Sequence, residues 1–306
     1  MKKIIKAVSF LAIGKTQESK EGSEGFKKYV GLASSKVLAV CPKKDKLDEL
    51  MGYESQSDPE YIKEDDNGKM AVVTFIVRTD PDTNNGIEIT NRATITLRPV
   101  KAYNKDKSKV QVIDQYGNFT WASTEVAEAG GKIEHANKLD KYRIACVGEC
   151  ALVDFLKKYL NVPDAYDYKN GTWTKKENGK AEEGIFSLEK IKDYFKGDFT
   201  ELQEAIALQP NNKIKLLYGV RTNDEGKQYQ AVCTREQMML NNGAGANAIT
   251  KLANDLANAK NNGSFQNIDY RVQELQEFDV QPTNLEETPS GAQGSEDSTS
   301  NGEMPW

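Results

Sequence analysis

Residues 71–78 read AVVTFIVR and residues 87–100 read IEITNRATITLRPV, and these two segments decide the fold class. The first is a run of β-branched and apolar residues, which is typical of a buried strand. The second alternates between apolar and polar residues, as a strand with one buried face does. Its apolar side chains share one face: Ile87, Ile89, Ala93, Ile95 and Leu97. The sequence therefore predicts a β-rich protein.

Further strands and several helices are expected on either side of these segments. Strands are predicted at residues 29–40, 110–114, 119–123, 142–147, 213–220 and 228–234. The turns at 115–118 and 223–227 each contain a glycine, so each indicates a hairpin. Helices are predicted at residues 43–51, 149–160, 187–195, 200–208 and 246–260. Gly52 should end the first helix, and Thr200 with Gln203 has the spacing of a capping box.

The charge is unevenly distributed along the chain. The net charge is -5, yet residues 272–306 hold eight acidic residues and no Lys or Arg. The remaining 271 residues have 38 acidic and 41 basic side chains, a net charge of +3. From residue 282 onward the composition is mostly Gly, Ser, Thr, Asn, Pro and acids, which cannot bury enough surface to offset the entropy of ordering. We predict a disordered acidic tail over residues 282–306.

Catalysis, metal binding and membrane insertion find little support in the sequence. His135 is the one histidine, and no phosphate-binding glycine loop or nucleophile elbow is present, so no catalytic residue and no cofactor is assigned. Cys146 and Cys150 could form a zinc site with His135 and Cys233, but the spacing matches no common zinc motif. Buried thiols are the simpler interpretation. No apolar run is long enough to span a bilayer, and the first residues favour a basic arm over an export signal.

Nucleic-acid binding is the chemistry that the sequence favours. Residues 98–109 hold five cations and one tyrosine, which can neutralise phosphates and offer a stacking surface. The phosphate-binding candidates are Arg92, Arg98, Lys101, Lys105, Lys107, Lys109 and Arg143. The base-stacking candidates are Tyr103, Tyr116, Trp121 and Trp173. The alternatives are a solvated hairpin tip for the cations and ordinary core packing for the aromatic residues.

The last four residues, Glu303, Met304, Pro305 and Trp306, form a second candidate site. An apolar end on an acidic segment suits a hydrophobic pocket rimmed by Lys or Arg in a partner. The acidic tail itself can occupy the protein's own basic groove until DNA displaces it.

The chain resembles a known family in its tail and in three internal segments. The tail resembles those of bacterial and phage single-stranded DNA-binding proteins, which end in acidic residues and a short aromatic terminus. Three segments are similar to such proteins of tailed phages, including crAss-like ones: VLAVCPKKDKLDELMG (37–52), VIDQYGNFTW (112–121), and YRIACVGE (142–149) with LVDFLKKYL (152–160). Residues 161–281 take no part in the resemblance.

The resemblance implies an OB-like barrel, a basic groove, cooperative coating of single-stranded DNA and a partner-binding tail. We therefore expect a basic arm (1–29), an OB-like core with helical insertions (30–240), a helix and connection (241–281) and the tail (282–306). The expected partners are single-stranded DNA and replication proteins such as a polymerase, helicase or primase, with self-association on DNA and no membrane. The expected role is phage replication and recombination in the cytoplasm of the infected host. The alternative is a structural or packaged virion protein of a tailed phage.

Overall fold

The computed structural model describes residues 28–65, 68–84, 86–114, 117–133, 142–160, 166–169, 172–175, 188–272 and 276–278, with backbone alone at 166–169, 172–175, 188–190 and 276–278. The strands are β1 (Lys28–Val40), β2 (Ile62–Asp65), β3 (Gly68–Thr79), β4 (Thr90–Lys101), β5 (Lys109–Asp114), β6 (Phe119–Ser123), β7 (Tyr142–Ile144), β8 (Cys146–Val147), β9 (Tyr166–Lys169), β10 (Thr172–Lys175), β11 (Ile214–Thr222), β12 (Gln228–Cys233), β13 (Leu240–Asn241), β14 (Ile268–Tyr270) and β15 (Gln276–Phe278). The helices are α1 (Lys44–Met51), α2 (Thr124–Glu128), α3 (Glu149–Tyr159), α4 (Leu188–Tyr194), α5 (Thr200–Ala207) and α6 (Ala246–Asn261).

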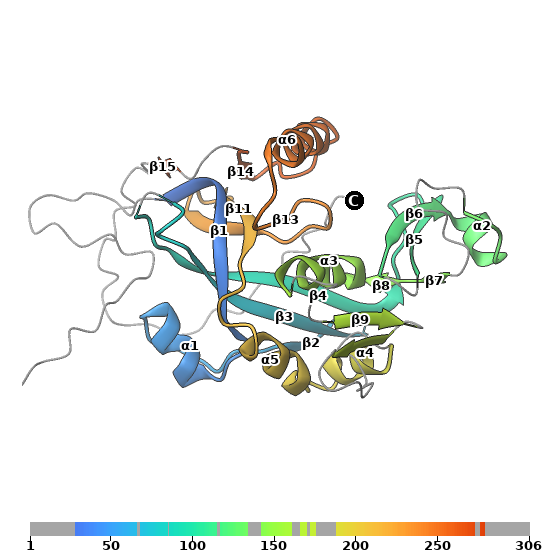
Figure 1. Cartoon of the computed structure of the whole chain (residues 1–306), viewed down its shortest axis with the longest axis horizontal. Helices are drawn as coiled ribbons and strands as arrows, with labels where there is room; N and C mark the ends of the chain where they lie inside the picture. The colour runs from blue at the N-terminus through green and yellow to red at the C-terminus, as the bar shows by residue number, and fades with distance from the viewer. Residues whose placement is uncertain are drawn as a thin grey trace, which may run out of the picture.

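The main sheet is antiparallel and strongly curled (Figure 1). Its strands follow the order β12-β11-β1-β3-β4-β8. The first half of β1 pairs with β11, as in Gly31 with Tyr218, and the second half pairs with β3, as in Val40 with Phe75. The curl brings β12 into contact with β4 at the other end of this order. The β-rich fold class predicted from the sequence is confirmed.

Strand β4 places its side chains as the alternating pattern predicts, and β3 is the buried strand expected of the apolar run. They pair in register from Ala71 opposite Leu97 to Arg78 opposite Thr90. Ile95 and Leu97 on β4 are buried inside the curl, whereas Arg92 and Arg98 belong to the opposite face. The alternation follows from the two-residue period of a strand.

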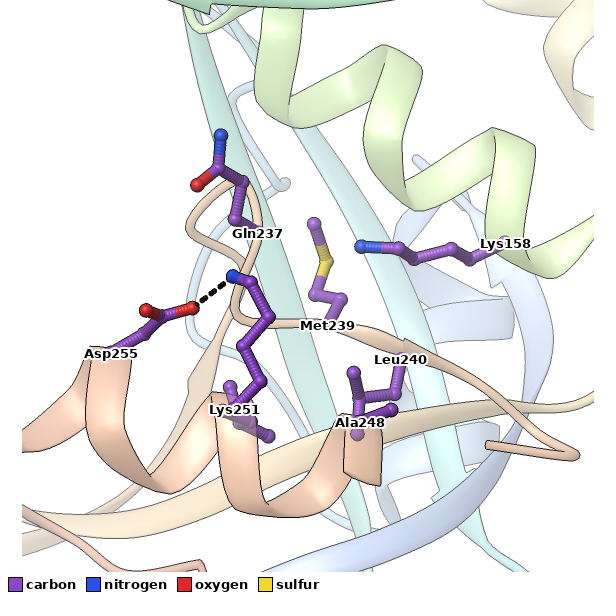
Figure 2. Close-up of a pocket in the computed structure, with 8 residues that line it drawn as sticks. Lys158, Gln237, Met239, Leu240, Ala248, Lys251 and Asp255 are labelled. Atoms are coloured by element: carbon purple, nitrogen blue, oxygen red, sulfur yellow. Dashed lines mark hydrogen bonds and ion pairs between the residues drawn. The ribbon is translucent and has the colours of Figure 1, made fainter. Parts of the chain in front are cut away.

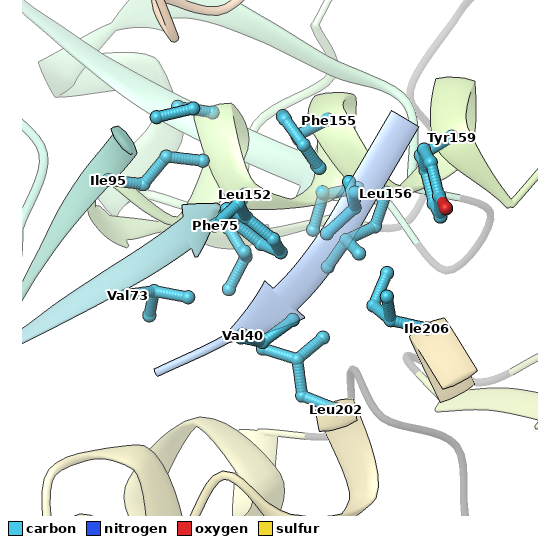
Figure 3. Close-up of a cluster of buried hydrophobic side chains, with 14 of the residues drawn as sticks. Val40, Val73, Phe75, Ile95, Leu152, Phe155, Leu156, Tyr159, Leu202 and Ile206 are labelled. Atoms are coloured by element: carbon cyan, nitrogen blue, oxygen red, sulfur yellow. The ribbon is translucent and has the colours of Figure 1, made fainter. Parts of the chain in front are cut away.

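The largest core fills the concave side of the sheet (Figure 3). Phe75 of β3 stacks on Phe155 of α3 with ring centroids 4.2 Å apart, and both side chains are fully buried. Burial of one such side chain contributes about 1.5–3 kcal/mol. Helix α3 enters this core directly after Gly148, whose φ of 80° and closeness to Thr96 leave no room for a side chain.

The predicted helices are present, but one predicted cap is wrong. Helix α1 ends at Gly52, whose φ of 63° lets its N–H donate to the carbonyl oxygen of Asp48. Helix α5 has no side-chain cap, because Thr200 already lies inside the helix and its N–H donates to Asp198 Oδ1. Gln203 donates instead to the carbonyl oxygen of Val40, 3.0 Å away, and ties α5 to β1.

A smaller lobe extends from the end of β4 (Figure 1). It consists of β5, β6, β7 and α2, and we call it the β5–β6 lobe. Its strands follow the order β6-β5-β7, and Val110, Val112, Ala122 and Ala127 form a separate core. The predicted hairpin of residues 110–114 and 119–123 is confirmed here.

The segment after residue 240 packs onto the main sheet. Leu252 and Leu256 of α6 bury Leu217 of β11, while β14 pairs with β11 and β15 with β1. Hairpin β9–β10 was not expected from the polar composition of residues 166–175, although Asn170-Gly171 stands between its two strands and is a common hairpin dipeptide. Within the described residues, no helix has the length and apolar character needed to cross a membrane.

Candidate nucleic-acid interface

The connection from β4 to β5 is a compact turn held by its own polar side chains. Asn104 Oδ1 accepts a hydrogen bond from the N–H of Lys109 at 2.8 Å. Asp106 Oδ1 accepts from the N–H and from the hydroxyl of Ser108, at 3.0 and 2.6 Å. Lys107 adopts a left-handed φ of 58° between them. These bonds pair the polar groups of the turn with one another. The lysine side chains take no part in them and are exposed.

Three of the predicted phosphate ligands lie on this turn. Lys105, Lys107 and Lys109 are all exposed, and none forms an ion pair with another described residue. Each ammonium group presents three donors and a full charge. A cluster of this kind at a lobe tip can neutralise several phosphates in a row.

A further phosphate candidate, Lys101, and a stacking candidate, Tyr103, share one carboxylate at the base of the turn. Lys101 forms an ion pair with Glu128 of α2 at 2.7 Å, and the hydroxyl of Tyr103 donates to the same carboxylate at 2.6 Å. The hydrogen bond to Glu128 raises the pKa of Lys101 and that of Tyr103, and these contacts lower the pKa of Glu128. The Lys101 ammonium also lies 6.0 Å from the centre of the Tyr103 ring. Lys101 is therefore cationic but partly neutralised by its neighbour.

Two predicted arginines are engaged by acids. Arg98 forms two hydrogen bonds with Asp65 of β2, at 3.0 and 2.7 Å, which is the bidentate geometry of a strong pair. Arg143 of β7 pairs with Glu149 in the first turn of α3, and the Glu149 side chain is buried. The Arg143 guanidinium thus stabilises a buried charge inside the fold.

Arg92 stands on the outer face of β4 next to an aromatic residue that the sequence did not single out. Its Nη2 donates to the hydroxyl of Tyr53 at 2.6 Å, and Tyr53 is 43% exposed. Tyr53 follows Gly52, the residue that ends α1. Its position in a loop directly after a helix stop is the signal that could have identified it.

The predicted stacking residues are only partly placed. Trp121 is half-buried on β6, opposite Gln111 of β5, in the same lobe as Tyr103. Trp173 lies on β10 opposite Tyr168, where the backbone alone is described. Tyr116 and the tail residues 303–306 lie outside the described residues. The lobe and the β4–β5 turn beside it therefore combine two of the aromatic candidates, Tyr103 and Trp121, with three of the lysine candidates.

The β11–β12 hairpin carries a further basic and aromatic group. Tyr229 is 42% exposed and pairs across the hairpin with Arg221, and Lys227 lies 5.5 Å above its ring. This arrangement gives two cations and a stacking face on one hairpin. Sequence reasoning predicted the hairpin but passed over these side chains, although Lys and Tyr around a glycine turn were visible in it.

No family model, curated protein or solved structure matches this chain.

A small cavity of about 240 Å³ separates α3 from α6 (Figure 2). Met239 and Leu252 form its apolar surface, and Lys158 and Lys251 extend along it. Both lysines are paired, Lys158 with Asp154 at 2.7 Å and Lys251 with Asp255 at 2.5 Å. Its lining contains no nucleophile beside a base, so it does not resemble a hydrolytic site.

The thiols are buried or half-buried, and their chemistry follows from that burial. Burial raises the pKa of Cys41 to about 12 and that of Cys233 to about 11, and it raises the pKa of Cys150 well above its ordinary value. Raised pKa values keep these groups protonated and poorly nucleophilic at neutral pH. In the part of the chain that is described, no three His, Cys, Asp or Glu residues gather as metal ligands do. His135 is outside that part.

Proposed function

We propose that this protein binds single-stranded DNA without sequence specificity. The observation that carries the proposal is the exposed lysine group Lys105, Lys107 and Lys109, which lacks carboxylate partners among the described residues and shares a lobe with Tyr103 and Trp121. Ammonium groups attract phosphates at any sequence, because the backbone carries no base information. Aromatic faces accept every base for the same reason.

The strand order supports an OB-like architecture for the curled sheet. Strands β11, β1, β3 and β4 lie in the order 4-1-2-3 of a Greek key, since β11 returns by a long connection to lie beside β1. Strand β12 follows β11 and contacts β4, which brings five long strands into a partly closed ring. A five-stranded, partly open Greek-key barrel is the description of an OB fold, whose members bind oligonucleotides.

The outer face of β4 extends the proposed path of the strand. Arg92 and Tyr53 offer a cation and an exposed ring near α1, and the β5–β6 lobe offers lysines at the far end of the same strand. Arg98 and Lys101 lie between them, each beside an acid. We propose that phosphates replace Asp65 and Glu128 as partners of these two cations when DNA binds.

The acidic tail is proposed to regulate this binding. With five acidic residues and no basic ones in residues 282–306, it is attracted to the same cations that bind DNA. We further propose that its end recruits replication proteins, and that the protein acts in phage replication and recombination in the cytoplasm of the infected bacterium. That part rests on the family resemblance of the sequence.

Fluorescence anisotropy of a labelled oligo(dT) strand tests the proposal, with the same strand in duplex form as the comparison. Binding to the single strand should be tight at low salt and weaken as salt rises, and tryptophan fluorescence should be quenched as bases stack. Absence of any binding at low salt, with and without the tail, would refute the proposal and favour a virion role.

A further inference from the structure

A second cavity, of about 580 Å³, lies between the β11–β12 turn and the loop that follows α6. Its volume is within the usual range for sites of small molecules. The lining is rich in amide side chains, two from the hairpin and two from the loop: Asn223, Gln228, Gln266 and Asn267. Amides both donate and accept hydrogen bonds, as the edges of nucleobases do.

One of these amides has an unmet hydrogen-bond requirement. Gln228 Oε1 is a buried oxygen with no hydrogen-bond partner among the described residues. Buried side-chain oxygens in folded proteins are nearly always paired, because an unpaired one has lost its water without replacement. Gln228 is also a lining residue of the cavity, so a rotation of its side chain would bring this unpaired oxygen to an N–H group that enters.

The loop that forms the opposite wall is held in an unusual backbone conformation. Phe265 has a φ of 62°, which is rare for a bulky residue. Its ring is fixed edge-on against Tyr270 at 5.2 Å, and the guanidinium of Arg235 lies 5.7 Å away. Conformations of this kind are concentrated at ligand sites, where the surrounding packing maintains them.

The charges around the cavity disfavour a phosphate inside it. Asp224 and Asp269 are lining residues, and Asp269 is paired with Arg271 at 2.7 Å. Lys260, the one cation of the lining, donates to the carbonyl oxygen of Tyr270 at 2.6 Å. A neutral ring with an N–H at its edge meets these conditions better than an anion does.

We infer that this cavity receives one base of the bound single strand, whose Watson–Crick-edge N–H donates to Gln228 Oε1. The inference rests on the proposed function and adds to it a base-binding subsite. Lys227 and Arg221 on the same hairpin lie outside the lining and are exposed, so they can hold the phosphates that flank the inserted base. The hairpin thereby binds backbone and base with different groups.

Paired oligonucleotides test the hydrogen bond directly. One is a dT strand of about 12 nucleotides, close to the length that one OB-like domain covers. The other has every thymine methylated at N3, which removes the edge N–H and keeps charge and stacking. The wild-type protein should bind the methylated strand about five- to tenfold more weakly. Gln228→Met should bind both strands equally, at the level of the methylated one.

Two further variants separate the hydrogen bond from other effects. Gln228→Glu keeps an acceptor oxygen and should retain the preference for the unmethylated strand. Gln209→Met, at the end of α5, is the matched control and should behave as the wild type. Gln228→Met should also keep the melting temperature, because it removes an oxygen that has no partner.

The outcomes distinguish the two proposals. If the wild type binds neither strand, single-strand binding itself is refuted. If it binds both with equal affinity, or if Gln228→Met discriminates as the wild type does, DNA binding stands and the base subsite is refuted.

Discussion

Replacing Lys105, Lys107 and Lys109 together by alanine should lower the salt dependence of DNA binding by a calculable amount. The three side chains are exposed and unpaired with described residues, so each can release one condensed counterion when it meets a phosphate. On single strands each contact contributes about 0.7 to the slope of log affinity against log salt, and three contribute about 2. Between about 50 mM and about 200 mM salt, the wild type should therefore lose about 20-fold more affinity than the variant.

The assay is the anisotropy of a labelled oligo(dT) strand across a salt series. The matched control replaces Lys44, Lys46 and Lys251 by alanine. It removes the same charge, but these lysines are paired with acids on their own helices. That triple alanine variant should keep the wild-type slope. Both variants should keep the melting temperature within a few degrees, since these positions are on the surface. An unchanged slope in the turn variant would place the phosphate path elsewhere on the molecule.

Three other perturbations have defined outcomes. Deleting residues 282–306 should tighten DNA binding most at low salt, whereas removing Trp306 alone should leave DNA affinity unchanged and abolish partner capture; equal affinity at all salts would refute tail competition. Asp80→Asn should cost about 2 kcal/mol in urea unfolding, because Lys213, which is partly exposed, would lose its charged hydrogen-bond partner. Burial opposes the ionisation of Asp80, but the contact with Lys213 outweighs burial and lowers the pKa of Asp80 below 3.8. The stability that this ion pair contributes is therefore complete above pH 3.8 and is lost as the pH falls through the lowered pKa. Gly148→Ala should cost about 2–4 kcal/mol, since its methyl group would lie 2.0 Å from a backbone oxygen of β4.

Local patterns were sufficient to predict most of the fold. The alternation over residues 87–100 predicted the buried and exposed faces of β4, and the apolar stripe of residues 149–160 predicted α3. Hairpin β9–β10 was missed because its polar composition outweighed a local signal, the Asn170-Gly171 dipeptide between two short alternating segments. The cap at Thr200 was wrong because the helix begins one residue earlier than the cap requires, and the N–H of Gln203 donates to the carbonyl oxygen of Phe199. Pairings between distant strands, such as β1 with β11, leave no trace in a local pattern.

The sequence predicts which residues make up the candidate site, but not which of its cations are already paired with acids. A count of cations cannot distinguish Lys105 from Arg98, since the partner of Arg98 is Asp65, 33 residues earlier in the chain. The sequence likewise predicts Arg143 as a surface cation, whereas in the fold it pairs with the buried side chain of Glu149. Exposed Tyr53 and Tyr229 were missed because exposure depends on tertiary packing. Sequence predicts which groups are present, and the fold decides which remain available.

The divided pairing of β1 has a consequence for how the chain is made. As the protein leaves the ribosome, the second half of β1 can pair with β3 early, but its first half must wait for β11, whose Tyr218 faces Gly31. At about 5–20 residues per second, that delay is about 10–40 s. Throughout it, the edge of β1 presents unpaired N–H and C=O groups to any other strand nearby. Nascent chains in a crowded cell are therefore open to strand pairing with other chains at this edge, and a chaperone that covers it should raise the yield of folded protein.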